Sequence, residues 1–183
     1  MCRRPMMTVR FEDQWLSRQD KGSSSFEERY AEQSCAFYEA GQAVVTYLLD
    51  LPLARVWIDP EDLQGGTELA SPARFADARY EAAARLGGAI CLDGLGLSGP
   101  HEWFDFANAT RVIELLAVAF PGDAAAERTW RCRVSEQLVR CFQRPAVQAA
   151  VWGVAKRLLE DFSLDGEAVR EIIAAALRDT RPA

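Results

Sequence analysis

A five-residue stretch, YEAGQ at residues 38–42, has the spacing of the helical zinc-binding motif H-E-x-x-H. In that motif two histidines on one face of a helix bind a zinc ion, and the glutamate acts as general base for the zinc-bound water. Here Glu39 keeps the place of the base, but Tyr38 and Gln42 replace the histidines. A glutamine oxygen is a poor zinc ligand, and the tyrosine hydroxyl, with an ordinary pKa of about 10, would have to lose its proton. We therefore expect no catalytic zinc at this position.

The elements that would position these residues are mostly helices. Apolar residues at helical spacing indicate a first helix from a capping box at Ser25 to about Leu49. Gly41 interrupts its pattern, as a glycine does where another element or a ligand packs closely. Two strands are expected at 53–60 and 67–70, then helices from Ser71 to about Leu92 and at 103–119, 124–142, 145–161 and 165–177, with a glycine-rich loop at 93–102. The sequence thus predicts a mainly α fold (α+β) with one small β-sheet or hairpin after the motif helix, residues 1–24 forming a loose arm and 25–183 one domain.

Composition and charge argue against several kinds of partner and compartment. The net charge is −6 and the basic residues, almost all arginine, are scattered among acids in the sequence, so we expect no nucleic-acid partner. No run of about 18 apolar residues occurs, so no membrane partner is expected. The chain has five cysteines, an odd number, and no two of them form a C-x-x-C pair. This pattern favours reduced thiols over a disulfide framework or a zinc finger. Without a signal-peptide pattern, we expect a cytoplasmic protein.

Several segments share a pattern with one family. The stretch AFYEAGQAVVTYLLDLPLARVWIDPED (36–62) resembles the peptidase domain of FtsH-type ATP-dependent zinc metallopeptidases, whose helix reads A-x-H-E-A-G-H-A-V-V before a strand ending in I-x-P. LGGAICLDGL (86–95) resembles the family's L-x-G-x-x-A-E, DFANAT (105–110) its D-L-x-x-A-T, and residues 151–173 its closing helices. The likeness covers about residues 30–177 and is closest to small stand-alone relatives, because no ATPase half or G-x-x-x-x-G-K-[ST] loop is present.

This resemblance implies a helical metallopeptidase-like domain. Tyr38, Gln42 and Asp105 stand at its three zinc-ligand positions, and Glu39 stands at the base position. Because both histidines are replaced, we expect a pseudo-peptidase that binds a protein or peptide, with no cofactor. In the family the strand beside the metal helix is an edge on which substrate peptides pair. Its counterparts here are Val56, Trp57 and Ile58, of which Trp57 either contacts peptide or packs in the core.

Two other interpretations stay open. Cys35 lies four residues before Glu39, and His101, the only histidine, lies four before Asp105. Together they could form a rearranged metal site, holding zinc, or a thiol nucleophile with a base. The alternative is a buried thiol, a solvated histidine and a polar network that fills the place of a metal. Finally, the stripe formed by Trp130, Val134, Leu138 and Cys141 is compatible with a structural scaffold or a homo-oligomer.

Overall fold

The computed structural model describes residues 26–70, 77–96 and 102–179. In these ranges the chain forms α2 (Phe26–Leu48), β1 (Leu53–Asp59), β2 (Gln64–Leu69), α3 (Ala78–Leu95), α4 (Glu102–Ala119), α5 (Ala124–Phe142), α6 (Pro145–Asp161), β3 (Ser163–Asp165) and α7 (Gly166–Asp179). The expected fold class, mainly α with one small sheet, is confirmed. The predicted arm at 1–24, the capping residue Ser25 and His101 lie outside the described residues. No helix in the described ranges combines the length and apolarity needed to cross a membrane.

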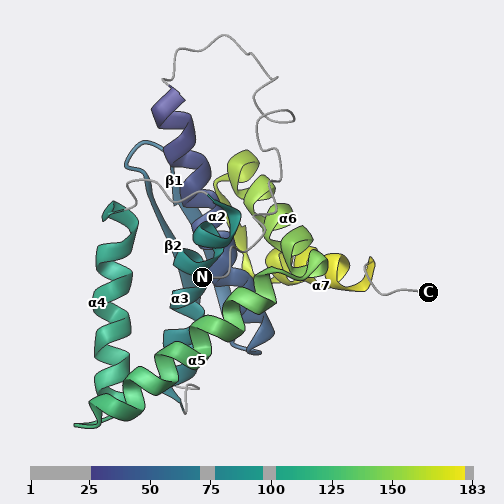
Figure 1. The fold of residues 1–183 in the computed structure, drawn as a ribbon. Coiled ribbons are helices and arrows are strands. Elements are labelled where there is room, and N and C mark those ends of the chain that lie inside the picture. The colour runs from purple at the N-terminus through teal and green to yellow at the C-terminus, as the bar shows by residue number, and fades with distance from the viewer. Residues whose placement is uncertain (1–25, 71–76, 97–101, 180–183) are drawn as a thin grey trace, which may run out of the picture.

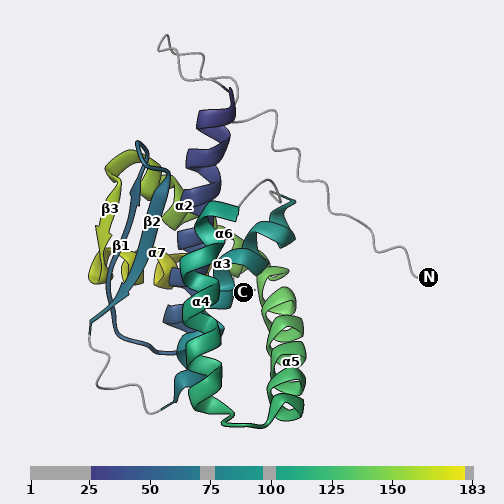
Figure 2. The same ribbon diagram turned by 90° about the vertical axis from the view of Figure 1, so that its left-hand side faces the viewer.

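Helix α2 lies at the centre of the fold, in contact with α3, α6, α7 and the strands β1 and β2. In Figure 2 the sheet lies on one side of the molecule and α5 on the other, with α2 and α3 between them. Every residue from 34 to 46 is buried. Phe37 packs edge-on against Trp152 of α6 at 4.7 Å between ring centroids. A helix buried on all sides must also bury its polar residues, so Glu39 and Gln42 need partners inside the protein.

Helix α2 ends at Leu48, close to the predicted boundary at about Leu49. Asp50 has a left-handed backbone, with φ of 54°. The amide of Asp50 donates to the Tyr47 carbonyl at 3.0 Å, and that of Leu51 to the Thr46 carbonyl at 3.0 Å. This pair of bonds is a Schellman motif, which satisfies carbonyls that a helix end leaves unpaired. The chain therefore turns sharply into β1, which returns along α2.

The three strands form an antiparallel sheet in the order β2-β1-β3. β1 pairs with β2 from Leu53↔Leu69 to Asp59↔Gln64 and with β3 over residues 55–57. A register shift after Leu53 allows Leu53 and Val56 both to face the core. The sequence did not predict β3, since three residues are too few to show alternation. Its Asp165 accepts hydrogen bonds from the amides of Glu167 and Ala168 and so caps α7, which begins one residue after the predicted start of the last helix at 165.

Helix α3 differs from its predicted bounds at both ends. It begins at Ala78, where the Asp77 side chain caps it by accepting a hydrogen bond from the Arg79 amide, whereas 71–76 lie outside the described residues. It also continues through residues 93–95, which the sequence assigned to a loop, and stops at Gly96 with φ of 69°. A glycine inside a helix, such as Gly94, costs about 1 kcal/mol relative to alanine. Packing of Leu95 against the large apolar core around α2 compensates for this cost.

A smaller apolar cluster joins α3 to α4. It contains Ala82, Val112, Leu115 and Leu116. At its edge the buried Glu81 accepts hydrogen bonds from Arg85 of α3 and Arg111 of α4, both at 3.2 Å. Figure 1 shows α4 along one margin of the molecule and α5 running obliquely from the short turn that joins the two helices. Both helices contact α3, and α5 also contacts α6.

Candidate functional site

Glu39 lies in the middle of α2 beneath strand β2. Only 2% of the residue is exposed. The hydroxyl of Thr67 on β2 is 2.8 Å from Glu39 Oε2 and 3.3 Å from the backbone oxygen of Glu39. The sheet therefore closes over the carboxyl group, and the side chain at the base position of the motif is bonded to protein.

The Thr67 hydroxyl can form a hydrogen bond with Glu39 in either protonation state. A threonine hydroxyl has one hydrogen, so it can donate to only one of the two Glu39 oxygens at a time. When the carboxyl is protonated, its own O–H donates to Thr67 Oγ1, and the threonine hydrogen is free for the backbone oxygen at 3.3 Å. Both contacts are then satisfied. When the carboxyl is ionised, the threonine hydrogen goes to Oε2 instead, and a hydrogen bond to a charged acceptor is the stronger kind.

Burial of the carboxyl group favours its protonated form. Burial raises the pKa of Glu39 to about 7, although the hydrogen bond from Thr67 and the charge of Arg85 oppose this. Arg85 is already engaged, because its Nε donates to Glu81 at 3.2 Å and its Nη1 to Asn108 Oδ1 at 2.9 Å. Desolvation of the carboxylate therefore outweighs both favourable interactions.

Cys35 lies beside Glu39, one helical turn earlier. A Cβ atom placed on Gly65 of β2 would be 2.8 Å from Glu39 Cγ and 3.0 Å from Cys35 Sγ, so both side chains pack under the same glycine. The pKa of the Cys35 thiol is raised, first by burial and then by the negative charges of Glu39, Glu32 and Asp59. A buried neutral thiol is a weak nucleophile. His101 and the side chain of Asp105 lie outside the described part, so the structure does not place them against Cys35.

Tyr38 and Gln42 are built into the core. The Tyr38 ring is 2% exposed and covers Gly88 of α3, where an added Cβ would be 2.9 Å from three ring atoms. Gln42 is also 2% exposed, and its Nε2 has no hydrogen-bond partner among the described residues. An amide nitrogen is a donor and does not bind a cation. In the described part of the chain no group of three or more histidine, cysteine, aspartate or glutamate side chains could hold a metal ion. The described donor set does not fit zinc.

The predicted peptide-binding edge at Val56, Trp57 and Ile58 is wrong. β1 is the central strand and pairs on both sides, so its backbone groups are already used. Val56 and Ile58 are buried against α2. Trp57 is half-buried on the opposite face, where its Nε1 donates to Glu68 Oε1 at 2.9 Å. A strand followed by a hairpin looks like an edge in sequence, but the short β3 occupies the other side.

Sequence reasoning missed Thr67, Gly65 and Arg85. Thr67 and Gly65 alternate on β2 and so face α2 together. The small residues in QGGTEL were the only local signal that another element approaches this strand closely. Nothing in the segment 78–95 singles out Arg85 as the charge that acts on Glu39. The partners of Glu39 therefore come from elements distant in sequence.

Replacing Thr67 with valine should destabilise the protein more at pH 8 than at pH 5. Valine has a similar shape but no hydroxyl, so an ionised Glu39 would lose its hydrogen bond. We expect a loss of about 2 kcal/mol at pH 8. Urea unfolding at both pH values measures it. Thr46→Val is the matched control, since the Thr46 hydroxyl donates to the Gln42 backbone oxygen, which does not titrate. Equal losses for Thr67→Val at both pH values would contradict the coupling.

Comparison with known proteins gives no family for this chain. No family model matches it, and no curated protein matches it.

Proposed function

We propose that this chain is a pseudo-peptidase, a non-catalytic relative of the FtsH-type peptidase domain that binds a protein or peptide. The observation that carries the proposal is the burial of Glu39 and its hydrogen bond to Thr67. A general base must reach a water molecule beside the scissile bond. Here the carboxyl is covered by β2, and Tyr38 and Gln42 are packed where ligands would stand. These contacts support a site that does not require a metal.

The proposed binding surface is the outer edge of β2. This strand is the last in the sheet order, and among the described residues no strand pairs with its outer side. An extended peptide can add to such an edge through main-chain hydrogen bonds. Gly65 and Gly66 have no side chains to obstruct that approach. Figure 2 shows β2 at one margin of the sheet, beside α4.

The described cysteines support a reducing compartment. Cys35, Cys91, Cys132 and Cys141 are all free thiols. Structural disulfides are typical of secreted proteins, whereas free thiols are the usual state in the cytoplasm. We place the binding module there. Its partner would be a protein or an extended peptide segment.

A hydrolase with a rearranged site is the second candidate, and one observation favours it. Cys35 and Glu39 lie under the same glycine of β2. The raised pKa of the thiol argues against it. An activity that Cys35→Ser abolishes would support this candidate against the binding module.

Elemental analysis of the tag-free protein tests the absence of a catalytic metal. We expect less than about a tenth of an equivalent of zinc, because the ligand types that zinc requires are missing. Proteolysis of casein should be at background with or without a chelator. About one equivalent of zinc together with chelator-sensitive proteolysis would disprove the pseudo-peptidase.

Peptide binding at β2 needs a separate test. Heptapeptides selected from a random displayed library should slow amide hydrogen exchange within 64–69. Methylation of alternate peptide nitrogens should abolish this effect, because strand addition depends on main-chain donors. Equal binding by the methylated peptides would exclude pairing at this edge.

A further inference from the structure

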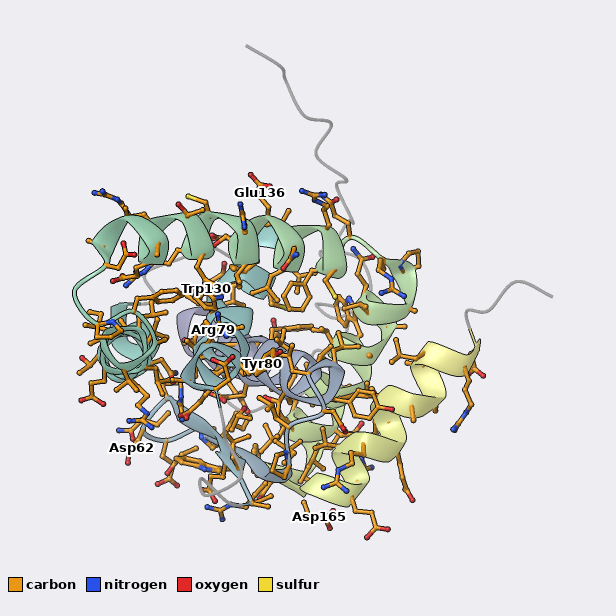
Figure 3. All side chains as sticks on the ribbon, turned by 90° about the horizontal axis from the view of Figure 1, so that it is seen from below. Asp62, Arg79, Tyr80, Trp130, Glu136 and Asp165 are labelled. Carbon is orange, nitrogen blue, oxygen red and sulfur yellow. The ribbon has the colours of Figure 1, made fainter. Side chains whose placement is uncertain are left out.

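A groove of about 440 Å³ lies on the opposite side of α2 from the sheet, between the end of α2, the start of α3 and the helix α5. Its lining is largely apolar. The residues that form it are Val45, Leu48, Leu49, Asp77, Arg79, Tyr80, Ala83, Trp130, Val134, Gln137, Leu138 and Cys141. Figure 3 shows Trp130 on the face of α5 that is turned toward Arg79 and Tyr80, whereas Glu136 points away.

Two aromatic side chains, Tyr80 and Trp130, line this groove and could anchor a partner. Tyr80 is 52% exposed although its ring is large and mostly apolar, and the neighbouring Leu48 is 38% exposed. The Trp130 ring is held in place by Phe120, with 5.9 Å between the ring centroids. Arg79 forms an ion pair with Asp77 at 2.6 Å, which leaves that end of the groove without net charge. Exposed apolar side chains that converge on one concave surface are typical of docking sites.

The solvent side of the groove is bordered by arginines of α5. This helix contains four arginines and two glutamates in a chain whose net charge is −6. Arg133 lies one helical turn from the lining residue Gln137, on the exposed side. Burial raises the pKa of the lining residue Cys141, and the charge of Arg144, just beyond α5, lies close enough to oppose that rise. Neither arginine has an ion pair among the described residues, whereas Arg131 and Arg140 each pair with a glutamate of α5.

We propose that this groove binds an amphipathic helix of a partner protein, with bulky apolar side chains on one face and carboxylates along its flank. A helix that lies in an apolar groove inserts side chains spaced at i, i+3, i+4 and i+7. Tyr80 and Trp130 would contact that face. The flanking carboxylates would pair with Arg133 and Arg144, which have no ion pair in the described ranges of the chain. The inference does not depend on peptide pairing at β2, because the two surfaces lie on opposite sides of α2.

The probe is a synthetic helix of about fifteen residues with leucines at i, i+4, i+7 and i+11 and glutamates beside them. Fluorescence anisotropy should detect its binding to the full chain. A peptide with the same leucines and lysines in place of the glutamates should bind about tenfold more weakly, as should a peptide with scrambled leucines. Failure of the glutamate peptide to bind, or equal binding by the lysine peptide, overturns the proposal.

Substitutions locate the site. Tyr80→Ser removes an exposed ring without opening the core and should weaken binding about tenfold. The double change Arg133→Glu and Arg144→Glu should do the same and transfer preference to the lysine peptide. Arg128→Glu is the matched control. Arg128 also has no ion pair among the described residues, but it lies about two helical turns before Glu136, which points away from the groove. An equal effect of Arg128→Glu overturns the groove as the binding site. A molecular mass in solution that doubles with protein concentration, and that Tyr80→Ser reduces, also overturns the proposal, because a second copy of the chain would then occupy the groove.

Discussion

Glu39→Gln should remove the largest part of the stability that the unmodified protein loses as pH rises from 4.5 to 7. Burial raises the pKa of Glu39 from the ordinary value of 4.5 to about 7. The folded state therefore holds a proton that the unfolded chain has released in this range. Below pH 4.5 both states are protonated and the contribution is fully present. It is lost as pH rises to 7 and is absent above that pH.

The expected size of this effect is about 3 kcal/mol, because each tenfold difference in proton affinity is equivalent to about 1.4 kcal/mol. Glutamine reproduces the protonated acid, with an N–H donor toward Thr67 and no charge. At pH 8 the variant should therefore be more stable than the unmodified protein, whereas at pH 4.5 the two should be nearly equal.

Urea unfolding across this pH range, measured for both proteins, gives a difference curve that isolates Glu39. Contributions of other carboxyl groups cancel, including Glu32, whose pKa is also raised by burial. Parallel curves would show that Glu39 is not a buried acid. A variant less stable than the parent at pH 8 would show that favourable partners of the ionised form outweigh the cost of its burial.

Gly41→Ala should destabilise the protein by about 2 kcal/mol, although alanine is the better helix former by about 1 kcal/mol. Helices α2 and α3 cross closely at this glycine. An added Cβ would be 2.6 Å from Cys91 Cβ and 2.9 Å from the Gly87 backbone oxygen. Neither atom is the free end of a flexible side chain. The helices would have to separate, which would disturb the packing of Tyr38 on Gly88 nearby.

Gly94→Ala is the matched control for this prediction. Gly94 is also a helical glycine, in α3, and a Cβ there would have no atom within 4 Å. We expect this variant to gain up to about 1 kcal/mol from helix propensity. Thermal and urea unfolding of the two variants would separate close packing from propensity. A Gly41→Ala protein as stable as Gly94→Ala would mean that the helix crossing adapts without cost.

Local sequence signals predicted most elements well. α5 and α6 have the predicted bounds, since Asp123 caps the first and Pro145 starts the second. Asp165 caps α7 as expected. The sequence placed Glu39 on a helix with Cys35 one turn earlier, and it marked Gly41 as a point of close approach. These properties depend on residues within a few positions of one another, so the sequence alone contains them.

Contacts between distant segments were beyond such reasoning. The sequence presented β1 as a free edge, but β3, more than a hundred residues later, pairs with it. It extended the glycine-rich loop back to Asp93, but packing of Leu95 on the core keeps those residues helical. Arg133 and Arg144 are eleven residues apart in the sequence, yet each lies near a lining residue of the groove, because α5 turns its apolar face toward α2 and α3.

By itself, the sequence determined that YEAGQ is a helical segment with an acid at its centre and without histidine ligands. Only the tertiary structure decided what surrounds that acid: Thr67 from β2, Gly65 above it, and Arg85 from α3, which is itself bonded to Glu81 and Asn108. The protonation state of a carboxyl depends on solvent exposure and on hydrogen bonds, and both are set here by elements 26 or more residues away along the chain.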